Sequence, residues 1–148
     1  MNVHGENAFV LTQRGNAYKV EKDYEKAMAD YSEAIKINPE FRRAYEQRGY
    51  IYSLQENYGP AISDFKMALS LNPKSYIAWC SLGFNYRQTG DLEKSLTCLD
   101  EALSIHPMYF DARLNRGITL MNLQKMRNPV PICRKLYLWR YGKTTNSK

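Results

Sequence analysis

The sequence predicts an all-α protein, a solenoid of repeated helix-turn-helix units, from three observations. A glycine recurs every 34 residues, at Gly15, Gly49, Gly83 and Gly117. A proline recurs at the same interval, at Pro39, Pro73 and Pro107. Between these markers, apolar residues are spaced three or four apart, which places them on one face of a helix. A constant period of this length indicates one structural unit copied along the chain.

The first helix of each unit carries the glycine. If the glycine is position 8, the units start at residues 8, 42, 76 and 110. Positions 4, 8 and 11 then share a helix face, as Trp79, Gly83 and Tyr86 do in the third unit. Because glycine costs a helix roughly 1 kcal/mol relative to alanine, its recurrence needs a packing reason. We predict that Gly15 faces the small Ala27 of the second helix, so that the two backbones approach closely.

The second helix of each unit is bounded by its own signals. Its apolar stripe occupies positions 20, 24 and 27, which are Ala27, Tyr31 and Ala34 in the first unit. The residues suited to cap its start are Asp23, Asn57 and Asp91. The helix is expected to end before the repeated proline, because the residue preceding a proline disfavours the helical conformation. Each unit is therefore predicted to be a helical hairpin.

This pattern resembles the tetratricopeptide repeat family, which has a bulky residue at position 4, glycine or alanine at 8, tyrosine at 11, alanine at 20 and 27, and proline at 32. The resemblance implies a right-handed superhelical solenoid. It covers three full units, 8–41, 42–75 and 76–109, and the first helix of a fourth, 110–126. The chain departs from the family at position 7, where leucine is replaced by Arg14, Arg48 and Arg116. We expect these arginines to lay their side-chain stems on apolar surface.

The repeat pattern stops after Met126, which leaves 127–148 as a basic, divergent C-terminal tail. Position 20 of the fourth unit is Pro129, and Pro131 follows it, so the expected second helix cannot form. Residues 132–141 have the pattern of a short helix with one apolar side. Two interpretations stay open. The tail caps the apolar face of the last repeat, or it is an unrelated C-terminal segment, as splicing or truncation would produce.

The net charge of +6 belongs to this tail. All 15 acidic residues lie at or before Asp111, whereas six of the 21 lysine and arginine residues lie after residue 126. The tail interleaves its basic residues with Tyr137, Trp139 and Tyr141. This combination supports an alternative function, an adaptor that contacts RNA or an anionic membrane through the tail. Nucleic acid is nevertheless not the partner that we favour.

The sequence shows no pattern for catalysis, a cofactor or a metal. Serine and threonine residues have no His–Asp partner set, and the three cysteines are odd in number and far apart. His4 and His106 have no further metal ligands at a suitable spacing. No apolar run reaches the roughly 20 residues of a membrane span, and the N-terminus lacks the features of a signal peptide. We therefore expect a cytoplasmic non-enzyme without a cofactor or metal.

The resemblance implies a protein–protein interaction scaffold or adaptor. In this family, the first helix of each unit lines a concave groove through positions 2, 5, 6, 9, 12 and 13. Residue by residue, this register assigns to the groove Thr12, Gln13, Asn16, Lys19, Arg43, Glu46, Gln47, Tyr50, Ile77, Cys80, Ser81, Phe84, Arg87, Gln88, Asp111, Leu114, Asn115 and Ile118. Amide and hydroxyl groups mixed with apolar side chains suit an extended or helical peptide. We expect a peptide or protein segment as partner, and self-association through the C-terminal repeat.

One specialised function within the family is disfavoured by the residues present. Members that bind chaperone C-termini use a carboxylate clamp of lysine, asparagine and arginine side chains at five groove positions. Asn16 matches one of these positions. The other four hold Thr12, Gln47, Ile77 and Ser81 in place of the lysine, asparagine and arginine that the clamp requires. A clamp-type co-chaperone is therefore an alternative that most of the required residues do not support.

Overall fold

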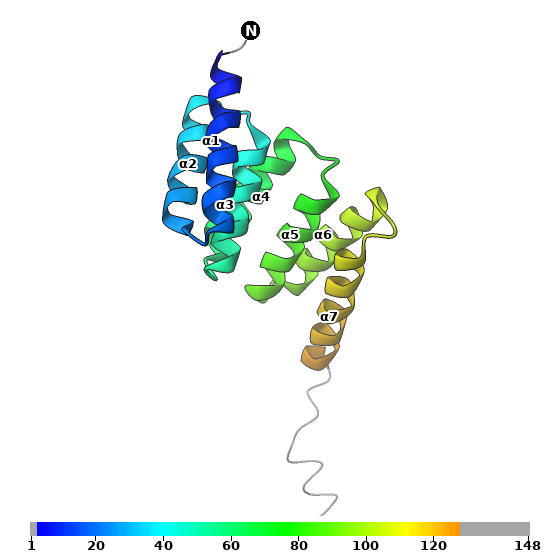
Figure 1. Ribbon diagram of the computed structural model, residues 1–148. Coiled ribbons are helices and arrows are strands. Elements are labelled where there is room, and N and C mark those ends of the chain that lie inside the picture. The colour runs from blue at the N-terminus through cyan, green and yellow to red at the C-terminus, as the bar shows by residue number, and fades with distance from the viewer. Residues whose placement is uncertain (1–2, 128–148) are drawn as a thin grey trace, which may run out of the picture.

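The computed structural model describes the backbone of residues 3–127 and the side chains of residues 7–127. This part of the chain is entirely helical and contains no strand. Its helices are α1 (Val3–Val20), α2 (Tyr24–Ile37), α3 (Arg42–Leu54), α4 (Tyr58–Leu71), α5 (Tyr76–Gln88), α6 (Leu92–Ile105) and α7 (Phe110–Arg127). Figure 1 shows these helices following one another in a curved row, from α1 at one end to α7 at the other. The predicted all-α solenoid is confirmed.

The helices form two layers that follow from their order in the chain. Each helix packs against the next one, so that consecutive helices are antiparallel neighbours (Figure 1). The odd-numbered helices also contact one another in sequence, α1 with α3, α3 with α5, and α5 with α7. The even-numbered helices of the described chain make no such contacts with one another. The first helices of the hairpins thus make up an inner layer, and the second helices make up an outer layer.

The turn inside each hairpin repeats the same backbone conformation. Lys22, Glu56 and Gly90 occupy the same position of successive units and all have positive φ angles, of 64°, 58° and 85°. This left-handed residue ends the first helix, as is common at helix C-termini. Asp23 follows as the N-cap of α2 and accepts a hydrogen bond from the backbone N–H of Lys26 at 3.2 Å. The side chains of the equivalent caps, Asn57 of α4 and Asp91 of α6, accept no hydrogen bond from a backbone N–H of the helix.

The repeated glycines pack against a large side chain of the second helix that the sequence did not suggest. A Cβ atom at Gly15 would lie 2.6 Å from Cε1 of Tyr31, and one at Gly83 would lie 2.8 Å from Cγ of Leu99. Tyr31 and Leu99 occupy position 24, whereas the prediction named Ala27 at position 20. At Gly83 the backbone oxygen of Ser95, which occupies position 20, would lie 3.1 Å from the same Cβ atom, so this glycine faces both positions. The glycine is small because a large side chain of the second helix lies directly over it.

The arginines at position 7 form ion pairs that the sequence analysis did not predict. Arg14 contacts Asp30 at 2.6 Å, and Arg48 contacts Asp64 at 2.8 Å, in each case across one hairpin. Both aspartates lie at position 23 and are buried. Each guanidinium donates two hydrogen bonds to its carboxylate, the geometry that suits arginine best. The arginines are therefore retained as parts of hairpin-closing pairs.

The helix bounds extend slightly past the predicted units at both ends. α1 begins at Val3, before the first unit at 8–41, and α7 ends at Arg127, just after the predicted partial unit 110–126. Arg127 contacts Glu93 of α6 at 3.0 Å. The predicted short helix at 132–141 and both interpretations of the tail lie outside the described residues.

Candidate functional site

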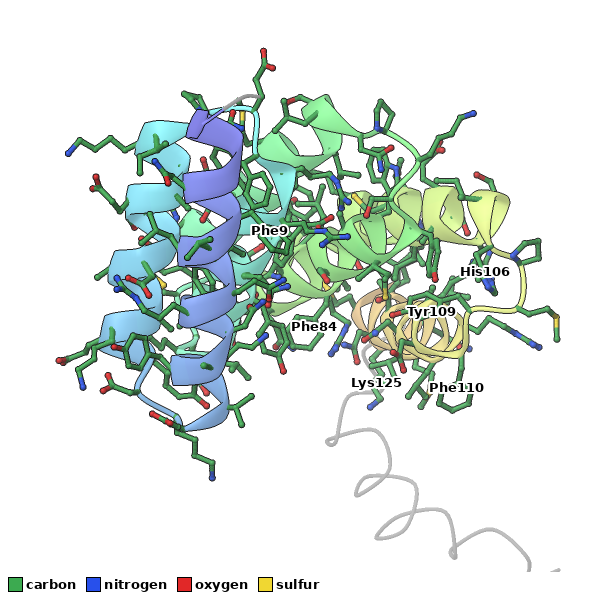
Figure 2. The ribbon with its side chains drawn as sticks, turned by 45° about the horizontal axis from the view of Figure 1, so that its top comes forward. Phe9, Phe84, His106, Tyr109, Phe110 and Lys125 are labelled. Carbon is green, nitrogen blue, oxygen red and sulfur yellow. The ribbon has the colours of Figure 1, made fainter. Side chains whose placement is uncertain are left out.

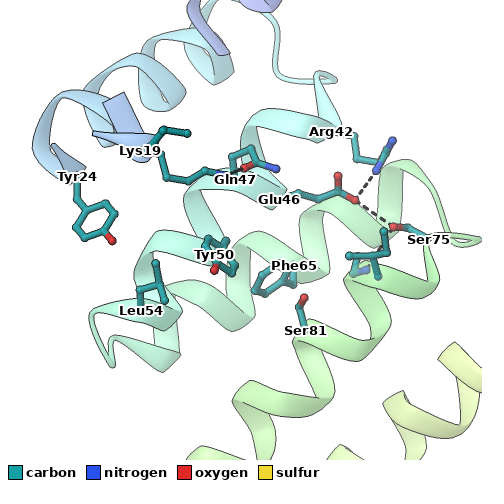
Figure 3. A pocket seen from close by; sticks show the side chains of 13 residues that line it. Lys19, Tyr24, Arg42, Glu46, Gln47, Tyr50, Leu54, Phe65, Ser75 and Ser81 are labelled. Carbon is teal, nitrogen blue, oxygen red and sulfur yellow. Dashed lines mark hydrogen bonds and ion pairs between the residues drawn. The ribbon is translucent and has the colours of Figure 1, made fainter. Parts of the chain in front are cut away.

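The inner layer of helices encloses a continuous groove. One cavity of about 520 Å³ lies between the end of α1, the length of α3 and the first half of α5. A second cavity of about 370 Å³ lies between α3, α5 and the start of α7. The two cavities share the side chains of Tyr50, Leu54, Phe65, Ile77 and Ser81. We refer to the two cavities together as the groove. Figure 3 shows its α1 end, where side chains from neighbouring hairpins point toward one another.

The structure brings many of the sequence-predicted site residues together in this groove. Those that line one or both cavities are Lys19, Glu46, Gln47, Tyr50, Ile77, Cys80, Ser81, Phe84, Asp111 and Asn115. Those that line neither cavity are Thr12, Gln13, Asn16, Arg43, Arg87, Gln88, Leu114 and Ile118. The predicted register is therefore most useful in the middle of the solenoid, where hairpins lie on both sides.

Internal bonds explain some of the residues that lie outside the groove. Thr12 is buried, and its hydroxyl donates to the carbonyl of Ala8 at 2.8 Å. The side chain of Asn16 accepts a hydrogen bond from the Tyr31 hydroxyl at 2.8 Å, which ties it to its own hairpin. Thr12 and Asn16 therefore stabilise the first hairpin, and the structure does not offer their side chains to a ligand.

The groove also contains residues that the sequence analysis did not name. Val20 and Leu54 lie at position 13, so the register that assigned Gln88 would have found them. Tyr24 and Phe65 come from second helices, outside the family register. The family register covers first-helix positions alone, so it could not have assigned them to the groove.

Lys19 lies at the α1 end of the groove. Lys19 donates a hydrogen bond to the side-chain carbonyl of Gln47, and its Nζ lies 5.3 Å from the ring centroid of Tyr50 (Figure 3). Burial lowers the pKa of Lys19 below the usual value for lysine. The groove thus holds a partly desolvated ammonium beside an aromatic ring, a place where a carboxylate of a bound segment would be stabilised.

The one carboxylate at this end is already neutralised. Glu46 accepts hydrogen bonds from the guanidinium of Arg42 and from the Ser75 hydroxyl, the latter at 3.1 Å (Figure 3). These bonds join α3 to the start of α5. Glu46 therefore holds neighbouring hairpins together, and its charge does not cancel the charge of Lys19.

The α7 end of the groove is built around Asn115. Its side-chain carbonyl accepts a hydrogen bond from Arg87 at 3.1 Å, and its amide donates to the carbonyl of Asp111 at 2.9 Å. The Arg87 guanidinium lies 5.2 Å from the ring centroid of Phe84. Burial raises the pKa of the nearby Cys80 thiol to about 11, so this thiol is neutral at neutral pH. This end is consequently polar but closely packed.

Side chains for metal binding are not clustered in the described chain. No group of three or more His, Cys, Asp or Glu side chains within residues 7–127 is arranged to hold a metal ion. Among the described helices, none combines the length and apolar character that crossing a membrane requires. The groove offers a half-buried lysine at its α1 end and exposed apolar side chains in its middle.

Solved structures with the same arrangement of helices are repeat domains. The first TPR of Spaghetti (RPAP3), bound to the HSP90 peptide SRMEEVD, matches with a TM-score of 0.79 and 22% identity, covering 81% of this chain and 95% of that one. The Sgt2 TPR domain from Aspergillus fumigatus matches at 0.77 and 21% identity, covering 82% of each chain. The Arabidopsis OM64 TPR domain matches at 0.77 and 22%, covering 80% of this chain and 98% of that one.

Family models match most of the sequence. The tetratricopeptide repeat models match residues 8–41 and 43–75, and a TPR repeat model matches residues 85–124. A search of curated proteins gives no match. Hairpin geometry, the repeated glycine and proline, and these three matches agree, and the chain belongs to the tetratricopeptide repeat family.

Proposed function

We propose that this protein is a non-catalytic interaction scaffold that holds a peptide or protein segment in its groove. One observation carries the proposal. Three apolar side chains in the middle of the groove, Tyr50, Leu54 and Ile77, are 47%, 48% and 53% exposed although they line both cavities. Exposed apolar residues that converge in a concavity favour binding, because a partner that covers them removes apolar surface from water.

The charge distribution of the groove indicates which kind of segment fits. A bulky apolar side chain would lie against Tyr50 and Ile77, and an acidic side chain would lie beside Lys19. The side-chain carbonyl of Gln47 already accepts from Lys19, so its amide N–H groups would be the ones to bond a carbonyl of a peptide backbone. The proposed partner is therefore a segment with an apolar anchor and an acidic residue on its α1 side.

The likeness to a domain that binds an HSP90 peptide supports the groove as the peptide site. It does not extend to that peptide, because four of the five clamp positions hold other residues. At these positions Thr12 is buried, Gln47 accepts a bond from Lys19, and Ile77 and Ser81 carry no charge. We therefore favour a different partner over an acidic chaperone C-terminus, and we place this role in complex assembly in the cytoplasm.

Self-association through the C-terminal repeat is a further part of the proposal. Phe110, Met121 and Met126 of α7 are 70%, 59% and 68% exposed. Figure 2 shows Phe110 pointing away from the body of the solenoid. Light scattering after size exclusion should show a concentration-dependent dimer that Met121→Glu abolishes. A monomer at every concentration would refute this part alone.

The groove is tested with matched variants of the full chain. Proteins captured from a cell extract by the wild type should be lost with Ile77→Glu and retained with Met67→Glu, which places the same charge on the exposed outer surface of α4. A captured partner is then purified and titrated by calorimetry. We expect Ile77→Glu and Tyr50→Ala to weaken its binding by about 30-fold or more, as for central anchors of an interface.

Two results would contradict the proposal. The first is equal loss of every partner with Ile77→Glu and Met67→Glu, which would place binding outside the groove. The second concerns the partner class and uses the peptide SRMEEVD as the probe. We expect no binding at micromolar concentration, and tight binding that requires Lys19 would identify a co-chaperone.

A further inference from the structure

Another cavity, separate from the two that form the groove, lies on the opposite face of α5. It has a volume of about 440 Å³, lies between α4, α5 and α6, and shares no lining residue with either groove cavity. On α5, Ile77 and Ser81 line the groove. This other cavity is lined from the same helix by Trp79, Leu82 and Tyr86. We call this cavity of about 440 Å³ the outer pocket.

The wall of the outer pocket differs from the equivalent surface of the first two hairpins. In the second hairpin, positions 7 and 23 hold the ion pair of Arg48 and Asp64. In the third hairpin the same positions hold Leu82 and Cys98, and both side chains line the outer pocket. Both members of the charged pair are thus replaced together, by apolar groups. The outer pocket is therefore apolar where the equivalent cavity of the second hairpin, of about 430 Å³, is lined by Arg48 and Asp64.

The wall of the outer pocket is apolar. Leu69, Tyr86 and Cys98 belong to the hydrophobic core cluster of the second and third hairpins, and only their outer edges reach the pocket. Burial raises the pKa of the Cys98 thiol to about 11, so it contributes no charge at neutral pH. The indole N–H of Trp79 donates to the carbonyl of Pro73 at 2.9 Å, so its polar group is occupied within the protein. The Trp79 ring remains as an apolar surface for a ligand.

The rim of the outer pocket is basic. The Nζ atoms of Lys66 and Lys94 lie 5.8 and 5.5 Å from the ring centroid of Tyr86. Lys94 pairs with Asp91 at 2.8 Å, but both side chains are exposed, and such pairs contribute little and exchange readily. No described carboxylate forms an ion pair with Lys66. Two exposed ammonium groups therefore flank an apolar cavity.

We propose that the outer pocket binds a bulky apolar side chain from an acidic protein segment, whose neighbouring carboxylates pair with Lys66 and Lys94. The apolar wall favours an aromatic or large aliphatic side chain, and the cavity volume lies in the range of known ligand sites. Carboxylates are favoured because rim charges of one sign select a partner of the opposite sign. This site is separate from the groove, so the scaffold would hold two segments on opposite faces of α5.

The test uses the charged pair of the second hairpin to replace the apolar wall of the outer pocket with a charged one. In the variant Leu82→Arg/Cys98→Asp, positions 7 and 23 of the third hairpin receive the residues that the first two hairpins already carry. Displayed random peptides that bind this variant are removed first, which also removes peptides bound in the groove. The remaining peptides are selected on the wild-type chain. We expect them to contain an aromatic or large aliphatic residue flanked by aspartate or glutamate.

A second variant keeps the test decisive if the first fails to fold. Lys66→Glu/Lys94→Glu changes only exposed side chains, so the fold should be retained. It should weaken the selected peptides about tenfold, as expected for the loss of two exposed charge pairs, and added salt should do the same. The inference is wrong if no peptide survives the subtraction, if the survivors are not acidic, or if they bind this variant as tightly as the wild type. Loss of binding with Ile77→Glu would instead assign the peptides to the groove.

Discussion

The three complete hairpins and the single helix α7 carry the same glycine in different surroundings. In the hairpins, an added Cβ at Gly15, Gly49 or Gly83 would lie between 2.6 and 3.3 Å from an atom of the second helix. At Gly117 of α7 the same atom would have no described neighbour within 4 Å. The glycine at position 8 thus has to be small in three units, because a second helix packs against it. In the fourth unit no described residue packs against it.

This contrast separates what the sequence repeats from what the structure uses. A helical glycine is destabilising by itself, and only contact with a second helix offsets that loss. α5 buries Ala78, Leu82 and Tyr86, whereas α7 buries only Ala112 and Thr119 among its described residues. We therefore expect substitutions to change the free energy of unfolding most where both helices of a unit are present and least in α7. Four predictions test this difference.

The largest effect is expected from Gly83→Ala. The new methyl group would lie 2.8 Å from Cγ of Leu99 and 3.1 Å from the backbone carbonyl oxygen of Ser95. The Ser95 backbone cannot move aside as a flexible side chain can, so we expect a loss of about 2–3 kcal/mol in the free energy of unfolding. Urea denaturation followed by circular dichroism measures it. A loss below about 0.5 kcal/mol would contradict the close approach of α5 and α6.

The second prediction compares arginines at position 7. Arg48→Met leaves the buried Asp64 without its partner and should lower the free energy of unfolding by about 2 kcal/mol. Arg116→Met removes an exposed pair with Asp100, whose side chains are 43% and 56% exposed, and should change it by less than about 0.5 kcal/mol. Equal losses in the two variants would show that burial does not set the strength of these pairs.

A double variant serves as the control for Arg48. Arg48→Leu/Asp64→Cys reproduces the apolar pair of the third hairpin and should recover most of the stability that Arg48→Met loses. No recovery would mean that the arginine acts through its other contacts, which include Ser32 at 3.2 Å.

The fold could be predicted because its signals are local and repeat. The period, the turn residues and the prolines each specify a hairpin within one unit, and all the hairpins agree. The pairing of Gly15 with Tyr31 was missed because a stripe of apolar positions gives the face of a helix but not its height along the partner. The pairing of Arg48 with Asp64 was available from the sequence, since arginine at 7 and aspartate at 23 occur together in two units and are absent together in the third.

The candidate site was predictable to a smaller extent. The register placed Tyr50 and Ile77 on the inner layer, and the structure finds them there. It also assigned Thr12, whose short side chain bonds to its own helix and is covered. Phe65 reaches the groove from a second helix and lies against Gly49 of its own hairpin, whereas the register assigned only first-helix positions to the groove.

The third prediction concerns the attachment of α7 to the last hairpin. Cys80 is covered partly by Ala112 of α7, and burial raises its thiol pKa to about 11 from an ordinary value of 9.0. The protonated thiol is thus favoured by folding, so its contribution is complete below pH 9 and is lost as the pH rises toward 11. Between pH 9 and 10, the free energy of unfolding should fall by about 1 kcal/mol on this account.

Denaturation at pH 8, 9 and 10 measures this fall, and Cys80→Ala should reduce it. Alkylation followed by mass spectrometry adds a local measurement. Cys80 should react faster than Cys98, because the cover of Cys98 comes from complete hairpins while that of Cys80 comes partly from α7. Equal protection of both thiols would indicate that α7 is held as firmly as the hairpins.

The smallest effect, and the only stabilising one, is expected from Gly117→Ala. With no described atom within 4 Å of the new methyl group, the change should act through helix propensity alone and raise the free energy of unfolding by about 0.5–1 kcal/mol. Urea denaturation of Gly117→Ala and Gly83→Ala side by side measures the increase expected for the first and the decrease expected for the second in the free energy of unfolding. Whether Gly117→Ala raises or lowers the free energy of unfolding also distinguishes the two interpretations of the C-terminal tail. A stabilised variant agrees with a tail that leaves this face of α7 uncovered. A variant destabilised to the extent of Gly83→Ala would require a segment packed over Gly117, and the segment that follows Arg127 would then be the cap.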